Sequence, residues 1–142
     1  LHAEEMLHRF ETLRPRTRRK LGRVVMKVDP EALDRIRDAL RHPVLKNRLA
    51  AIATADAFAA VDLLAESFRH ISREDHQEAR IRAAKVMSNA ESDDTLSMLR
   101  EMVQLPESPV RDAAVEALQK RERAVQGRRH AVKFTASAAE GN

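Results

Sequence analysis

Histidine and carboxylate side chains are the groups in this sequence best suited to chemistry, and two of the six histidines lie close to two carboxylates. His70 and His76 flank Glu74 and Asp75, so a single turn can offer nitrogen and oxygen ligands to a metal ion. A turn that reverses the chain also collects polar residues without any metal. The sequence has no cysteine, which excludes a zinc–thiolate site, a thiol nucleophile and a disulfide. We expect no metal and no cofactor.

Motifs typical of catalytic and nucleotide-binding sites are missing from the sequence. There is no Gly-x-Ser-x-Gly elbow, phosphate-binding loop or dinucleotide fingerprint, and three glycines cannot build one. Asp93 and Asp94 form an adjacent carboxylate pair. They lie at an expected helix start, where negative charge is favoured by the helix dipole. The prediction is that this chain is not an enzyme.

Basic residues form a dense group near the N-terminus, with no acidic residue among them. This N-terminal basic cluster consists of Arg14, Arg16, Arg18, Arg19, Lys20 and Arg23. Such a cluster favours binding of nucleic acid, acidic lipid or an acidic partner, and a solvated helix face is the structural alternative. The sequence has no Tyr or Trp on which bases can stack, so nucleic-acid binding depends on charge alone.

The composition of the 142 residues favours helices. Hydrophobic residues make up 43 % and charged residues 34 %, with four Phe and no other aromatic residue, which argues against a β-sandwich or barrel. No apolar run is long enough to span a membrane, and we expect a cytoplasmic location. The net charge is +5 for residues 1–28 and −3 for residues 91–124, so head-to-tail contacts are favoured. Exposed ion pairs are weak, so we predict a monomer in dilute solution.

One sequence pattern occurs four times. It starts at Thr17, Leu45, Ala79 and Val110, at steps of 28, 34 and 31 residues, with apolar or small residues four, seven and eight positions later. That spacing predicts an amphipathic helix, and a second apolar stripe precedes each copy. The chain is therefore expected to form four helix pairs, in residues 1–28, 29–58, 59–90 and 91–124. The position after each start is basic and is occupied by Arg18, Lys46, Arg80 and Arg111.

Capping residues mark where these helices are expected to begin. Asp29 before Pro30, Ser72, Ser92, and Ser108 before Pro109 are the predicted N-terminal caps, and Pro43 and Pro15 mark two further starts. The stripes predict a core. Its expected members include Leu49, Ile52, Val86, Leu99 and Leu118, with Met98 and Met102 more often core than exposed. The four repeated basic residues should point in one direction, either paired with carboxylates or available to an anionic ligand.

The sequence resembles the HEAT repeat family, in its short bacterial form of about thirty residues. The resemblance rests on Val110-Arg111 with Ala113-Ala114 and Ala117-Leu118, and on the run from Asp29 to Leu33, and it covers roughly residues 3–124. It implies an all-α fold, an α-solenoid of about four stacked antiparallel helix pairs with the second helix of each pair on the concave face. An irregular helical bundle is the alternative. Residues 125–142 lack a sustained stripe, and we expect a poorly ordered basic tail rich in small residues.

The resemblance is informative about architecture and nearly silent about function. We expect a protein–protein interaction scaffold, a non-catalytic domain of a longer bacterial protein. The apolar surface of the first helix, at Met6, Leu7, Phe10 and Leu13, exceeds what an end repeat should expose. One alternative is a nucleic-acid or anionic-ligand binding module that uses the N-terminal basic cluster. A second is a HEAT-like lyase-type enzyme subunit, because some bilin lyases are built from similar repeats.

Overall fold

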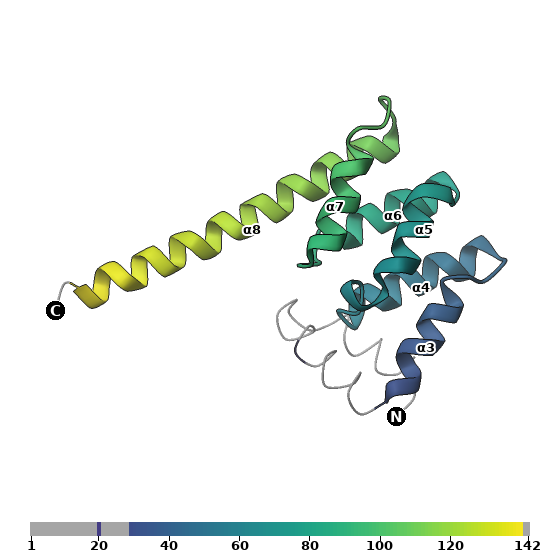
Figure 1. The fold of residues 1–142 in the computed structure, drawn as a ribbon, viewed down its shortest axis with the longest axis horizontal. Helices are drawn as coiled ribbons and strands as arrows, with labels where there is room; N and C mark the ends of the chain where they lie inside the picture. The colour runs from purple at the N-terminus through teal and green to yellow at the C-terminus, as the bar shows by residue number, and fades with distance from the viewer. Residues whose placement is uncertain (1–19, 21–28, 141–142) are drawn as a thin grey trace.

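A computed structural model of the chain describes Lys20 and residues 29–140, with side chains in the last helix described as far as Arg129. All regular structure within residues 29–140 is helical, and no strand is present there (Figure 1). The elements are α3 (Pro30–Ala39), α4 (Leu45–Ala57), the short 3-10 helix η1 (Asp62–Leu64), α5 (Ala65–Glu74), α6 (Gln77–Met87), α7 (Asp93–Met102) and α8 (Pro109–Glu140). The expectation of an all-α protein is confirmed. None of these helices combines the length and apolar character needed to cross a membrane.

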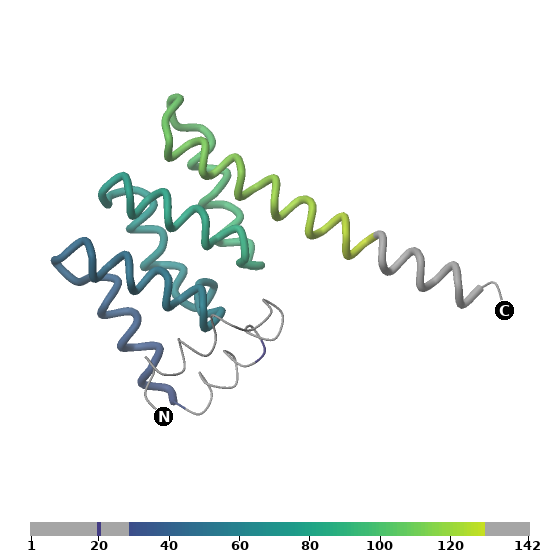
Figure 2. Tube along the Cα trace, turned by 180° about the vertical axis from the view of Figure 1, so that it is seen from behind, coloured from purple at the N-terminus to yellow at the C-terminus, as the bar shows by residue number. Residues whose placement is uncertain are grey.

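The helices lie in two layers. Short turns join α3 to α4, α5 to α6 and α7 to α8, and the two helices of each pair pack against each other. Helix α6 contacts both α4 and α8, and α5 contacts α7, so the pairs follow one another in order (Figures 1 and 2). We call α3, α5 and α7 the first layer, and α4, α6 and α8 the second layer. The N-terminal pair expected in residues 1–28 lies outside the described residues.

The core forms where the two layers meet. Its fully buried large side chains include Ile52 of α4, Phe68 and Ile71 of α5, Met87 of α6 and Leu99 of α7. Five residues were expected in this core. Ile52 and Leu99 are buried, while Leu49, Val86 and Leu118 are partly buried and pack against its edge.

Helix α7 turns a slightly different face to the core than the apolar stripe predicts. Met98 and Met102 are buried, as expected for core residues, and Thr95 is also fully buried. The apolar stripe that precedes the last copy of the pattern consists of Leu96, Leu99 and Val103, and of these Leu96 and Val103 are only partly buried. Methionine is flexible enough to fill irregular space between helices, which allows these two residues to replace branched side chains in the core.

Two of the expected N-terminal caps form, and two differ. Ser92 Oγ accepts a hydrogen bond from the Thr95 amide at 3.2 Å, and Ser108 Oγ accepts one from the Arg111 amide at 3.2 Å. Asp29 occupies the N-cap position of α3, but its carboxylate binds the Arg35 guanidinium at 3.1 Å instead. Ser72 does not begin α6. Helix α5 continues through it to Glu74, and the Ser72 hydroxyl donates to the Arg69 carbonyl oxygen.

The last helix extends further than the sequence pattern suggests. The repeat domain was expected to end near residue 124, and the helix that begins at Pro109 continues past that point to Glu140. Among its side chains described as far as Arg129, the buried ones are Val110, Ala113, Ala114 and Ala117, near its N-terminal end. From Glu122 to Arg129 every side chain is exposed, and the helix projects beyond the other helices (Figure 2). Gly127 does not interrupt it, because one glycine costs a helix only about 1 kcal/mol.

Candidate functional site

Most of the predicted N-terminal basic cluster lies outside the described residues. Lys20 alone is described, and it is exposed. Arg18, the first of the repeated basic positions, is also outside them, whereas Lys46, Arg80 and Arg111 lie on the three second-layer helices. Lys46 is exposed and the two arginines are half-buried. Within the described part of the chain, none of these three side chains forms an ion pair with a carboxylate.

The buried residues show that equivalent positions of α4 and α6 are 32 residues apart, whereas the sequence pattern placed them 34 residues apart. The matching buried residues are Ala51, Ile52 and Ala55 in α4, and Ala83, Ala84 and Met87 in α6. At this step Arg48, not Lys46, takes the position of Arg80. Both arginines are half-buried and donate to backbone carbonyl oxygens before their own helix, Arg48 to His42 at 2.9 Å and Arg80 to Ser72 at 2.9 Å. The shared sequence signal is an arginine followed by an apolar residue and, three positions on, an alanine.

Arg48 also connects two successive helix pairs through a two-point ion pair with Asp75. Its Nη2 and Nε atoms lie 2.7 and 2.9 Å from the two carboxylate oxygens, and the side chains are only 18 % and 7 % exposed. Burial by itself raises the pKa of the Asp75 carboxyl. Hydrogen bonds from Arg48 and from the His76 amide outweigh it, so this pKa lies below its ordinary value. Asp75 is therefore held as a carboxylate and serves as a structural connection.

The turn that gathers His70, Glu74, Asp75 and His76 is thus occupied by structural contacts. The Asp75 carboxylate faces Arg48, and His76 Nδ1 accepts a hydrogen bond from the Glu78 amide at 3.2 Å, which caps α6. Among the residues that the structure describes, no three His, Asp or Glu side chains are grouped so that they could hold a metal ion.

A second polar cluster joins η1 to the start of α7. The Asp62 carboxylate accepts hydrogen bonds from the amides of Glu91 and Ser92, at 2.9 and 3.2 Å, and from the Thr95 hydroxyl at 3.1 Å. Arg121 of α8 donates to that same hydroxyl oxygen at 2.9 Å. Burial raises the pKa of Asp62, but these hydrogen bonds outweigh it and hold the pKa below its ordinary value. Every member of the cluster is thus used to fix α7 and α8 in place.

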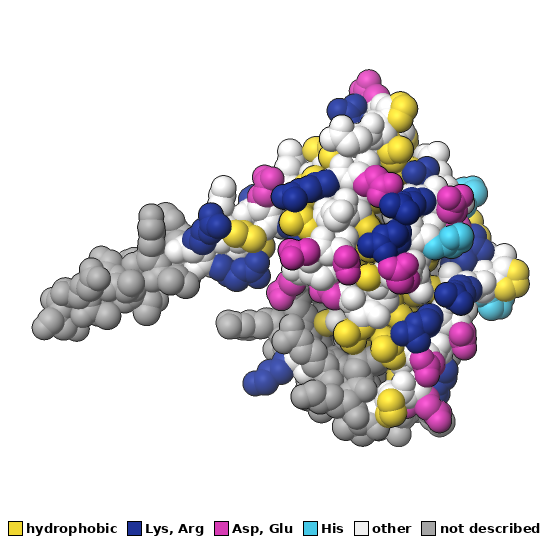
Figure 3. Space-filling view, viewed as in Figure 1, with side chains coloured by type: hydrophobic (Ala, Val, Ile, Leu, Met, Phe, Trp, Pro, Cys, Tyr) yellow, Lys and Arg dark blue, Asp and Glu magenta, His cyan; other side chains and the backbone are white. Residues whose placement is uncertain are grey.

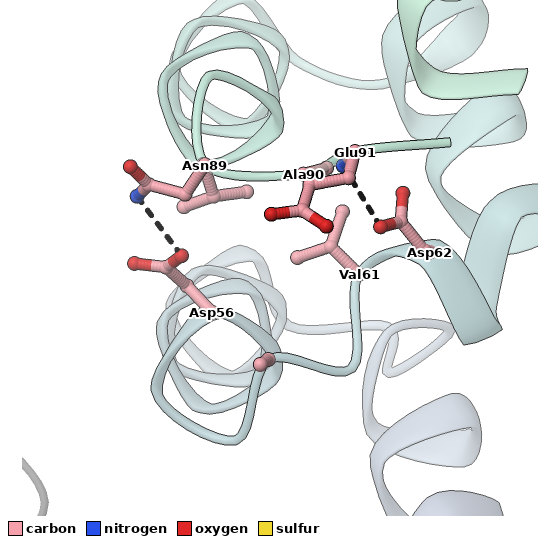
Figure 4. Close-up of a pocket in the computed structure, with 8 residues that line it drawn as sticks. Asp56, Val61, Asp62, Asn89, Ala90 and Glu91 are labelled. Atoms are coloured by element: carbon pink, nitrogen blue, oxygen red, sulfur yellow. Dashed lines mark hydrogen bonds between the residues drawn. The ribbon is translucent and has the colours of Figure 1, made fainter. Parts of the chain in front are cut away.

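Beside this cluster is a small pocket at the ends of α4 and α6 (Figure 4). Its volume is about 40 Å³, enough for a few water molecules and no larger ligand. Asn89 Nδ2 donates to the Asp56 carboxylate at 3.1 Å across one side of it, and Asn89 Oδ1 accepts from Lys120 of α8 at 2.9 Å. This amide therefore connects all three second-layer helices.

A larger opening lies between α4 and α6 on the second layer, and we call it the α4–α6 groove. Its volume is about 460 Å³, within the range of about 300–1,000 Å³ that is usual for binding clefts. Leu49, Ile52, Ala53, Asp56 and Ala57 of α4 and Arg82, Lys85 and Val86 of α6 line it. The floor is aliphatic, and the α6 side carries two exposed cations. The sequence pattern does not reveal this groove, because its residues belong to two helices and three of them, Leu49, Ile52 and Val86, were expected in the core.

The two layers differ in charge. The second-layer helices, with α8 counted to Arg129, carry eleven basic and five acidic side chains, whereas the first-layer helices carry five basic and eight acidic. In the view of Figure 3, with α5 and α7 toward the viewer, Arg and Lys side chains are interspersed with Asp and Glu. Arg73 pairs with Glu101 at 3.0 Å and Arg69 contacts Asp94 at 3.7 Å, so these first-layer charges join α5 to α7. The charge difference therefore also separates the two layers, whereas the sequence predicted it between the two ends of the chain.

The described residues thus form an all-α protein of successive helix pairs, with a groove and an excess of cations on one layer. Comparisons of the chain with protein-family models, with curated proteins and with solved structures give no match.

Proposed function

We propose that this chain is a HEAT-like helical-repeat scaffold that binds another protein on its second layer. The α4–α6 groove carries the proposal, because it combines partly exposed Leu49 and Val86 and exposed Ala53 with exposed cations at its edge. Protein-binding surfaces pair a desolvated apolar centre with a polar rim that gives orientation and specificity. In this proposal the chain itself performs no chemistry.

Contacts between successive helix pairs support the repeat architecture. In a solenoid each repeat contacts only its neighbours, so stability depends on the interfaces between them. Arg48 and Asp75 connect the α3–α4 pair to the α5–α6 pair, and Arg73 and Glu101 connect the latter to the α7–α8 pair. Both ion pairs join neighbouring helix pairs, although through different helices, and such contacts between neighbours support a solenoid over an irregular bundle.

Site-specific photo-crosslinking in cells that naturally produce the protein tests the scaffold proposal. A benzophenone amino acid at Ala53, an exposed position in the groove, is compared with the same amino acid at Leu63, which is 57 % exposed on η1. We expect a crosslink to one defined protein from Ala53 and none to that protein from Leu63. The absence of any crosslinked protein from Ala53, and from further exposed second-layer positions such as Lys46 and Gln119, contradicts the proposal.

The cations of the second layer also favour a second candidate, an anionic-ligand binding module. Arg123 and Arg129 of α8 are exposed and form no ion pair with a described carboxylate. A gel-shift titration with duplex and single-stranded oligonucleotides separates the two candidates. Phosphate contacts require an affinity that falls steeply with salt, so the absence of binding at low salt excludes nucleic acid as the ligand.

A further inference from the structure

We propose that the α4–α6 groove receives one acidic amphipathic helix of the partner protein. This inference rests on the proposed scaffold function and specifies the chemistry of the segment that binds. The partner helix would lie along the groove with its apolar residues on the aliphatic floor and its carboxylates toward the α6 side.

The shape and lining of the groove favour a helix. Two neighbouring helices create a channel between them, and a third helix fills such a channel with side chains at positions i, i+3 or i+4, and i+7. Leu49 and Ala53 of α4 and Val86 of α6 give that channel an aliphatic floor that a partner can reach, with the buried Ile52 beneath it. Ala53 is exposed and carries only a methyl group, so an approaching helix meets no long side chain at the middle of α4.

The charges around the groove favour an acidic partner. Helices α4 and α6 together carry five basic and two acidic side chains. Lys85 forms no ion pair with a described carboxylate, and Arg82 contacts Glu78 at 3.3 Å in a pair whose side chains are each 51 % exposed. Such an exposed pair is weak, so the Arg82 guanidinium can bind a partner carboxylate as well. The one acidic residue of the lining, Asp56, already accepts a hydrogen bond from Asn89.

Two other occupants fit less well. A nucleic acid needs cations along a backbone and flat side chains for its bases, but the lining holds no aromatic residue. A second copy of this chain offers acidic helices in its first layer. The apolar residues of α7, such as Met98, Leu99 and Met102, are however buried in its own core, so the described part of a folded copy has no free acidic amphipathic helix to donate.

Selection from a peptide library tests the inference without a known partner. The probe is a display library of helix-favouring peptides of about 18 residues, or five helical turns, randomised at all positions and selected against the full chain. We expect the enriched peptides to combine apolar residues at i, i+3 or i+4, and i+7 with an excess of Asp and Glu. Enrichment without any acidic excess overturns the inference.

Variants of the chain then test whether the selected peptide binds in the α4–α6 groove. The best peptide is synthesised with a fluorescent label, and its affinity is measured by anisotropy. We expect the double change Arg82→Glu with Lys85→Glu to weaken binding by about ten-fold or more, and higher salt to weaken binding to the unchanged chain. Ala53→Trp fills the groove and should weaken binding to a similar degree. The matched control, Arg41→Glu with Arg100→Glu, reverses two exposed charges outside the groove and should leave the affinity unchanged.

The outcomes separate this inference from the proposed function. Unchanged affinity in both the charge-reversal and the Ala53→Trp variants overturns the groove as the site, while a protein crosslinked at other second-layer positions still supports the scaffold. Acidic peptides that bind the groove, without any protein crosslinked from Ala53, Lys46 or Gln119, support the binding chemistry and contradict the scaffold. If no peptide is enriched and nothing crosslinks, both are overturned.

Discussion

The two layers of this protein differ in how many of their basic side chains form ion pairs. In the first layer, Arg35, Arg37, Arg69 and Arg73 are all in ion pairs, and two of these arginines connect α5 to α7. In the second layer, ion pairs with described carboxylates involve three of the eleven basic residues, Arg48, Arg82 and Arg128. Exposed pairs contribute little stability, so the difference bears mainly on what each face offers to a partner. The first layer has largely paired its cations, and the second presents most of its cations to solvent.

The largest expected effect comes from weakening the contact between the layers. Ile52 lies on α4, is 1 % exposed and packs in the core that the two layers share. Replacing it with alanine should lower the free energy of unfolding by about 2–5 kcal/mol, through lost burial and the cavity left behind. Urea unfolding followed by circular dichroism measures this.

The matched control for Ile52 is Leu63→Ala, because Leu63 is 57 % exposed on η1. That change should alter the free energy of unfolding by less than about 0.5 kcal/mol. Equal losses in the two variants would mean that the layers do not share one cooperative core.

The next largest effect concerns the most buried ion pair of the second layer. Arg48→Met leaves the Asp75 carboxylate, 7 % exposed, without its charged partner. Breaking a buried ion pair lowers the free energy of unfolding more than breaking an exposed one. The Arg48–Asp75 pair is intermediate in burial. We expect a loss of about 1–3 kcal/mol in the free energy of unfolding at neutral pH. A double-mutant cycle with Asp75→Asn measures the coupling between the two residues, and a coupling near zero contradicts the assigned role.

A smaller effect should appear as a pH dependence at Asp62. The pKa of this carboxyl is lowered in the folded chain, so its contribution to stability is present above its ordinary pKa and is lost as the pH falls through the lowered value. Asp62→Asn should therefore lower stability at pH 7 by about 1 kcal/mol, as for one hydrogen-bonded carboxylate, and should flatten the loss of stability on acidification below about pH 5. Urea midpoints at several pH values test this, and an acid profile parallel to that of the unchanged chain contradicts it.

The sequence predicted the elements better than their exact faces. Helices α3 to α7 and the start of α8 follow from apolar stripes, because a 3.6-residue period is strong in a chain this rich in alanine and leucine. Because alanine occurs at many positions, the sequence pattern does not fix how α4 aligns with α6. It aligned Lys46 with Arg80, whereas the buried residues show that Arg48 corresponds to Arg80. The end of α4 was also unmarked. Ala59 there adopts a positive φ of 52°, a conformation for which glycine is the usual signal.

The groove was beyond the reach of a single-sequence pattern for a physical reason. Its walls come from α4 and α6, and only their packing decides that Val86 lies at the surface edge while Met87 is fully buried. Hydrophobic periodicity identifies the buried side of each helix, but it does not measure the space left between two helices. The predicted basic positions Lys46, Arg80 and Arg111 lie on the same layer as the groove.

The smallest effect is expected from an exposed ion pair of the first layer. Arg73 and Glu101 form a two-point pair, with both distances 3.0 Å, but both side chains are about half exposed. In water the gain from such a pair is offset by the cost of ordering two long side chains, and salt screens what remains. Arg73→Gln should therefore leave the melting temperature within the error of calorimetry at physiological salt. It should also leave peptide binding at the α4–α6 groove unchanged, because Arg73 is not among the residues that line it. A clear fall in melting temperature would show that first-layer pairing stabilises the stack of helix pairs, and the contrast between the layers would then be one of stability as well as of binding.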